Sequence, residues 1–211
     1  MNYTQLVQSI QDYTQNEETS FVSNIPNFVQ QAEERINRSI MLPELRKNAT
    51  ASTTTDNKYL ARPSDFLAVF SLAVIDGDGD YTYLLDKDVN FIREAYPSAS
   101  TTGLPLYYSQ FDGDSTGTEG NFILGPTPNA AYEVELHYYY DPESIVTAGT
   151  SWYGDNAEAA LLYGSLIEAY TYMKGEADLI SLYTGRYNEA MGQLTGIDIR
   201  SNRDDYRDGK V

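Results

Sequence analysis

Cysteine is absent from the 211-residue chain, and histidine and tryptophan each occur only once. The absence of cysteine excludes disulfide frameworks, thiolate nucleophiles and cysteine-bound zinc. No apolar run approaches the length of a membrane span, and the first residues lack the basic start and continuous apolar stretch of a secretory signal. We therefore expect a protein without a membrane partner that is made and assembled in the cytoplasm.

Basic residues are also scarce. The chain has 14 lysines and arginines against 31 aspartates and glutamates, which gives a formal net charge of −17. Tight binding to nucleic acid depends on neutralising phosphates, so this charge predicts repulsion from DNA. Tyrosine, in contrast, is abundant, with 19 copies against seven phenylalanines. Tyrosine suits surfaces that are buried at one end and wet at the other, so the composition favours interfaces.

The first 48 residues contain two segments with apolar side chains at helical spacing. The first covers residues 3–13, and the second runs from Ile25 to Ile40. Ser23 is the expected cap of the second helix, Pro26 fits its first turn, and Pro43 should end it.

Helical spacing returns near the end of the chain. Asp155 is the expected cap of a helix whose apolar residues cover most of its circumference and which Gly175 ends. A fourth apolar stripe begins at Leu179 and stops near Gly196.

Between about Thr50 and Pro142 the apolar residues follow the two-residue period of strands. The run from Leu67 to Ile75 meets the sequence DGDGD and predicts a hairpin with a polar turn. One or two helical turns are expected within Asp88–Tyr96, and three further strands follow. The last of these places one set of residues on one face: Tyr132, Val134, Leu136, Tyr138 and Tyr140.

These patterns predict an α+β fold, in which an antiparallel helical bundle is interrupted by an inserted antiparallel β-domain. The bundle comprises residues 1–48 and 150–196, the β-domain comprises 49–149, and a disordered or extended C-terminal arm comprises 197–211. The arm has four basic and four acidic residues and almost nothing apolar. We interpret it as a docking arm on an acidic body, and the alternative is a solvated end without a role.

Catalytic chemistry finds little support in the sequence. DGDGD lacks the glycine and the glutamate of a calcium loop, since Tyr81 and Lys87 occupy those positions, so a hairpin tip is the better interpretation. The same interpretation applies to Asp112 and Asp114. His137 is the only histidine, and no nucleophile-elbow, phosphate-loop or dinucleotide motif accompanies it. We expect no catalytic residue, no metal site and no cofactor.

Four segments resemble the head-tail adaptor and neck proteins of tailed bacteriophages. Phe122–Ser144 (FILGPTPNAAYEVELHYYYDPES) is similar to a recurring strand, turn and strand, and Lys58–Val74 resembles its partner strands. Phe21–Asn48 resembles the opening helix of these proteins, and LLYGSLIEAYTYMKGEADLISLYTGRYNEAM is similar to their returning helix pair. The resemblance extends to the tail tubular protein A class of short-tailed phages and covers nearly the whole chain.

The resemblance implies a structural virion protein that forms a ring, of twelve copies in related adaptors, under the portal protein. The helical part and the arm would face the portal, and the β-domain would face the nozzle or other tail components. DNA would pass through the ring without specific binding. From the chemistry of the arm, we expect the portal contacts to be made by Arg200, Arg203, Tyr206 and Arg207. The alternatives are another tail or baseplate connector and a carbohydrate-binding or hydrolytic β-protein.

Overall fold

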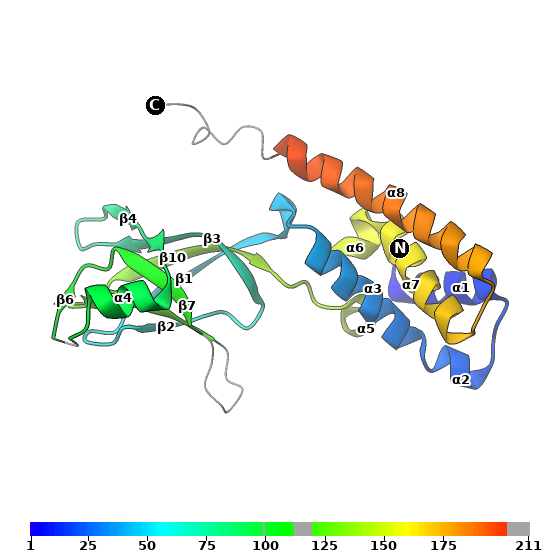
Figure 1. Ribbon diagram of the computed structural model, residues 1–211, viewed down its shortest axis with the longest axis horizontal. Helices are drawn as coiled ribbons and strands as arrows, with labels where there is room; N and C mark the ends of the chain where they lie inside the picture. The colour runs from blue at the N-terminus through cyan, green and yellow to red at the C-terminus, as the bar shows by residue number, and fades with distance from the viewer. Residues whose placement is uncertain (99, 112–119, 202–211) are drawn as a thin grey trace. The chain divides into compact units, whose positions relative to one another are not determined.

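The computed structural model describes residues 1–98, 100–111 and 120–201, and side chains up to residue 195 (Figure 1). The chain divides into two compact units. The first, called the helical unit here, combines Met1–Leu45 with Pro142–Val211, and the second, the β unit, is Arg46–Asp141. Helices and mainly antiparallel sheets therefore alternate along one chain, which confirms the predicted α+β fold class.

The helical unit opens with α1 (Tyr3–Thr14), which buries Leu6 and Ile10 as its apolar spacing predicts. The Asn2 side chain accepts a hydrogen bond from the Gln5 backbone N–H, and the Gln5 side chain accepts one from the Asn2 N–H. This reciprocal pair satisfies two of the donors that the start of a helix leaves without partners.

The predicted second helix is α3 (Ile25–Ser39), with Pro26 in its first turn as expected. The expectation that Ser23 caps it is wrong. An unexpected short helix, α2 (Thr19–Val22), occupies the polar stretch before it, and Ser23 is the C-terminal cap of α2. Asn24 therefore takes the cap position of α3. A 3₁₀ turn, η1 (Pro43–Leu45), follows α3.

Two short helices precede the long ones at the end of the chain: α5 (Ile145–Ala148) and α6 (Trp152–Asn156). The predicted capping role of Asp155 is wrong, because Asp155 lies inside α6 and the Ser151 side chain caps that helix through the Gly154 N–H. The next helix, α7 (Glu158–Tyr172), packs against α1, α3 and α8, so it is buried on several sides as its composition predicts.

The last helix, α8 (Ala177–Ser201), buries Tyr183, Tyr187, Ala190 and Leu194 against α7 and its neighbours. The expected stop near Gly196 is wrong, because the helix continues to Ser201. A glycine inside a helix costs only about 1 kcal/mol relative to alanine, and α8 also contains Gly185 and Gly192. Residues 197–201 of the predicted arm are therefore helical, and residues 202–211 lie outside the described part of the chain.

The β unit contains two four-stranded sheets, and its first strand begins earlier than the expected start near Thr50. In spatial order the first sheet consists of β1 (Arg46–Ser52), β10 (Glu133–Tyr140), β3 (Phe66–Ile75) and β4 (Tyr81–Tyr83), all antiparallel. The second sheet consists of β2 (Tyr59–Ala61), β8 (Asn121–Gly125), β7 (Tyr107–Phe111) and β5 (Leu85–Asp86).

Smaller elements complete this unit. In the second sheet β5 and β7 are parallel, and a separate parallel pair joins β6 (Thr102–Gly103) to β9 (Thr127–Pro128). The predicted short helix is α4 (Val89–Ala95), which packs on β7 and β8.

The core of the β unit lies between the two sheets. The predicted alternation in β10 is confirmed, because Val134, Leu136 and Tyr138 are buried there and Tyr132 and Tyr140 pack at its margin. From the second sheet, Tyr108, Phe122, Leu124 and Leu60 fill the other half of this core. The residues between them along each strand therefore face away from the core, on the two outer sides of the unit.

Candidate functional site

The DGDGD segment forms the turn of the β3–β4 hairpin, as predicted. One carboxylate oxygen of Asp76 accepts hydrogen bonds of 3.0 Å from the backbone N–H groups of Asp78 and Asp80. Gly79 has a φ of +89°, which favours glycine. Asp76 is thus engaged in shaping the turn. Asp112 and Asp114 lie outside the described residues.

His137 lies on the outer side of the first sheet. Its ring meets Phe70 edge-on at a centroid distance of 5.2 Å, and its backbone neighbours across the sheet are Asn48 and Ser71. Within the described residues, no group of three or more His, Asp and Glu side chains is placed to hold a metal ion. His137 therefore packs on an aromatic ring, and the Arg46 guanidinium lies 3.9 Å from the centre of that same ring.

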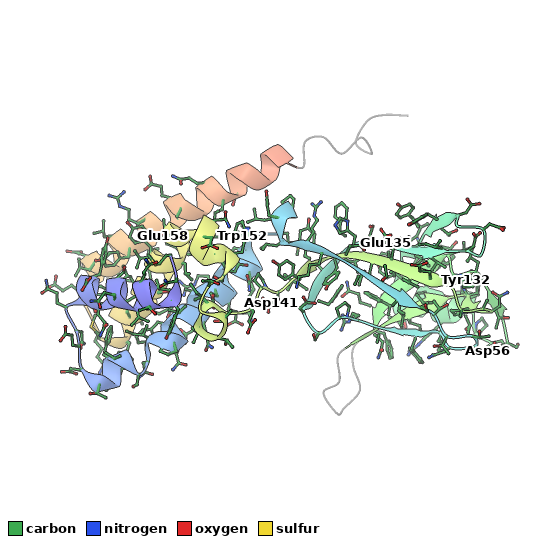
Figure 2. The ribbon with its side chains drawn as sticks, turned by 180° about the vertical axis from the view of Figure 1, so that it is seen from behind. Asp56, Tyr132, Glu135, Asp141, Trp152 and Glu158 are labelled. Atoms are coloured by element: carbon green, nitrogen blue, oxygen red, sulfur yellow. The ribbon has the colours of Figure 1, made fainter. Side chains whose placement is uncertain are left out.

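The same outer side carries a cluster that we call the acidic tyrosine face: Tyr81, Tyr83, Glu133 and Glu135. Strand register places them in two adjoining rows, Glu133–Ile75–Tyr81 and Glu135–Ala73–Tyr83. The Tyr81 hydroxyl donates a hydrogen bond of 3.3 Å to Glu135, which is labelled in Figure 2, and the Tyr81 and Tyr83 rings stack. The negative charge of Glu135 raises the pKa of Tyr81, with smaller contributions from desolvation and Glu133. The face is thus acidic and aromatic together.

The outer side of the second sheet carries a different cluster, which we call the cationic aromatic face: Lys58, Tyr59, Arg93 and Phe111. The rings of Tyr59 and Phe111 meet across β8 at 5.8 Å. The Lys58 ammonium lies 5.5 Å from the Tyr59 ring centre, and the Arg93 guanidinium lies 5.3 Å from that of Phe111. Each cation therefore rests on an aromatic ring within cation–π range.

The helical unit has two adjoining hollows beside the C-terminal half of α8, with volumes of about 190 and 290 Å³. Leu194 and Asn156 line both of them. Trp152 lines the smaller hollow and Glu158 the larger one, and both residues are labelled in Figure 2. Their small size and mixed lining fit a contact surface better than a small-molecule pocket, which usually exceeds about 300 Å³.

The sequence did not single out Glu33, a carboxylate that is only 5% exposed. It accepts hydrogen bonds from the Ser144 hydroxyl at 2.6 Å and from the Ile145 N–H at 2.9 Å, at the start of α5. Its position in the apolar stripe between Val29 and Ile36 could have indicated a buried carboxylate, because a charged residue in such a stripe needs buried hydrogen-bond partners.

Of the predicted portal-contacting residues, Arg200 lies in the last turn of α8. Arg203, Tyr206 and Arg207 lie outside the described residues, so the joint role of these four residues stays a prediction. No helix in the described part of the chain is long and apolar enough to cross a membrane.

The fold and its surfaces define a class of protein: an α+β protein in which the two outer sides of a β unit carry clusters of charged and aromatic side chains. Comparison with known families places it more closely. The family model described as SU10 adaptor protein matches residues 1–209. The chain therefore belongs to the SU10 adaptor protein family and is a bacteriophage adaptor with a structural role. A search of curated proteins found no significant match.

Proposed function

We propose that this protein joins the portal of the phage head to the tail, as one copy of a ring that surrounds the DNA exit channel. The observation that carries the proposal is the family match, which spans both units and all but two residues of the chain. The ring, of twelve copies by resemblance, would occupy the neck of the virion after assembly in the host cytoplasm.

The charge of the chain supports a role as a channel wall. The net charge is −17, and both units contribute, with 8 basic and 17 acidic residues in the helical unit and 6 and 14 in the β unit. Counterion release from neutralised phosphates drives protein binding to DNA, and an acidic wall offers little of it. DNA would therefore pass the ring without adhering to it.

The end of the chain supports a docking arm. At 1.5 Å per residue, α8 is about 37 Å long and α7 about 22 Å, so α8 runs past its main packing partner (Figure 1). The last turn of α8 carries Arg200, and the following residues include Arg203, Tyr206 and Arg207. Arginines form strong paired hydrogen bonds with carboxylates, and tyrosine is a common anchor at interfaces. We assign the portal contacts to this segment and the tail or nozzle contacts to the β unit.

Electron microscopy of the full chain mixed with the portal protein of the same phage tests the assignment. We expect an added ring layer on one end of the portal. Separate particles, under conditions that keep both partners folded, would contradict the proposed function.

Charge variants test the arm. We expect Arg200→Gln, Arg203→Gln and Arg207→Gln combined to weaken portal binding at least tenfold, and deletion of 202–211 to do the same. The matched control is Arg38→Gln, Lys174→Gln and Arg186→Gln, which removes the same charge from exposed positions of the helical unit. Equal binding by the two triple variants would show that the arm makes no specific contact, even if the ring layer forms.

A further inference from the structure

The β unit presents two faces of opposite chemistry on opposite sides. The acidic tyrosine face lies on the outer side of the first sheet, and the cationic aromatic face lies on the outer side of the second. The core packs between the two sheets, so the faces point away from each other. One copy of the unit therefore cannot satisfy its own acidic face with its own cationic face.

The acidic tyrosine face combines two carboxylates with two exposed tyrosine rings. Among the described residues, no lysine or arginine lies within 4 Å of Glu133 or Glu135. The tyrosine rings beside them are largely in solvent, with Tyr81 51% and Tyr83 60% exposed. A face that combines exposed tyrosines with two carboxylates is suited to binding a surface with cations and aromatic rings.

The cationic aromatic face meets that description. No carboxylate of the described residues lies within 4 Å of Lys58 or Arg93, although Glu94 is exposed beside Arg93 on α4. Tyr59, beneath Lys58, is itself 41% exposed. Lys58 and Arg93 therefore rest on aromatic rings and have no ion-pair partner among the residues that the structure describes.

We infer that the acidic tyrosine face of one copy binds the cationic aromatic face of the next copy. The two faces match in charge, with two carboxylates against two cations, and each carries exposed rings. Because they lie on opposite sides, the contact is heterologous, and repeated heterologous contacts close into a ring when the rotation allows. This inference rests on the proposed ring and identifies the surfaces that join its subunits. A contact of each face with itself would place like charges together and is disfavoured.

Cysteine pairs test the contact, because the native chain contains no cysteine. The variants are Tyr83→Cys on one face and Tyr59→Cys on the other, both at exposed positions. On the portal, with a short bismaleimide crosslinker, the double variant should give a ladder of oligomers. A mixture of the two single variants should give dimers, and each single variant alone should give none.

Charge reversal provides the second test. Glu133→Lys with Glu135→Lys should abolish the ladder, and so should Lys58→Glu with Arg93→Glu. Combining all four substitutions should restore it, which a folding defect would not do.

The outcomes separate this inference from the proposed function. Rings on the portal without a ladder from the double variant would overturn the inference and leave the proposed function standing. Dimers from a single variant alone would also overturn it, since they indicate a face that binds itself. If the unmodified chain forms no ring on its portal, the proposed function fails and the inference fails with it.

Discussion

The two units differ in where they place their large apolar side chains. The described part of the helical unit exposes four of them, Tyr13, Met41, Tyr172 and Leu182, whereas the described part of the β unit exposes eight. The helical unit buries four of its tyrosines, Tyr153, Tyr170, Tyr183 and Tyr187, and exposes Tyr13 and Tyr172. The β unit holds several outward, on two charged faces. The difference indicates that the first unit is a packed scaffold and the second is a display of contact surfaces.

Separate cores should make the two units respond independently to core substitutions. Phe122 is fully buried in the β unit, where its ring meets Phe66 and Tyr108 edge-on. We expect Phe122→Ala to destabilise that unit by about 3–5 kcal/mol and Leu166→Ala to destabilise the helical unit by about 2–5 kcal/mol. Hydrogen exchange measured by mass spectrometry should show lost protection in the mutated unit only. Equal loss in both units after either substitution would break the comparison.

Glu33 tests whether the scaffold depends on a polar contact as well as on apolar packing. Glu33→Ala removes the acceptor for the Ser144 hydroxyl and the Ile145 N–H, and we expect a loss of about 2–3 kcal/mol in the free energy of unfolding. Glu33→Gln keeps an oxygen acceptor and should cost less. The control is Glu34→Gln on the exposed side of α3, which should change little. Urea denaturation of the three variants measures the free energy of unfolding that each one loses. A loss for Glu34→Gln as large as that for Glu33→Ala would contradict the expected order.

The sequence predicted those elements whose signal is local. The alternation of Val134, Leu136 and Tyr138 and the stripe of α3 depend on one segment each, and both are confirmed. The capping roles of Ser23 and Asp155 were wrong because short helices intervene, and each buries only one or two residues, too few to produce a periodic pattern.

The contact faces were beyond such prediction for a different reason. Lys58 and Tyr59 meet Phe111 and Arg93 only because β8 lies between β2 and β7 and α4 packs beside them. Their separation in sequence conceals the cluster. The acidic tyrosine face could be predicted in part, because the alternation of β10 places Glu133 and Glu135 on one side of the strand. The tyrosines beside them belong to β4, which pairs with β3 and not with β10 itself.

Alkaline pH should weaken both units, and the β unit more. Burial raises the pKa of Tyr108 and Tyr138 in the β unit, and of Tyr183 in the helical unit, to about 12 from an ordinary value of 10. A raised pKa in the folded state means stability that is complete below pH 10 and is lost as the pH rises through 12. Unfolding followed from pH 9 to 12 should therefore show a decline, which Tyr108→Phe reduces in the β unit and Tyr183→Phe in the helical unit. A decline that neither variant alters would indicate another titrating group.

The smallest expected effects come from one ion pair in each unit. Lys47 and Asp65, on the β unit, are 2.6 Å apart, and Asp65 also accepts a hydrogen bond of 2.8 Å from Tyr138. Burial tends to raise the pKa of Asp65, but these hydrogen bonds and the charge of Lys47 outweigh it and lower the pKa. Arg38 and Glu34, on α3, pair one helical turn apart with both side chains largely in solvent.

Double-mutant cycles should give about 0.3–0.5 kcal/mol for Arg38 with Glu34 and up to about 1 kcal/mol for Lys47 with Asp65. The lowered pKa of Asp65 adds a signature that distinguishes the two pairs. The stability that depends on the negative charge of Asp65 is complete above the pKa of Asp65 in the unfolded chain, near 4. This stability disappears as the pH falls through the lower pKa that Asp65 has in the folded protein. The Lys47–Asp65 coupling should therefore persist at pH 4 and vanish in stronger acid. Coupling energies of equal size for the two pairs at neutral pH would mean that Tyr138 adds nothing to the Lys47–Asp65 pair. Ion pairs would then not distinguish the β unit from the helical unit.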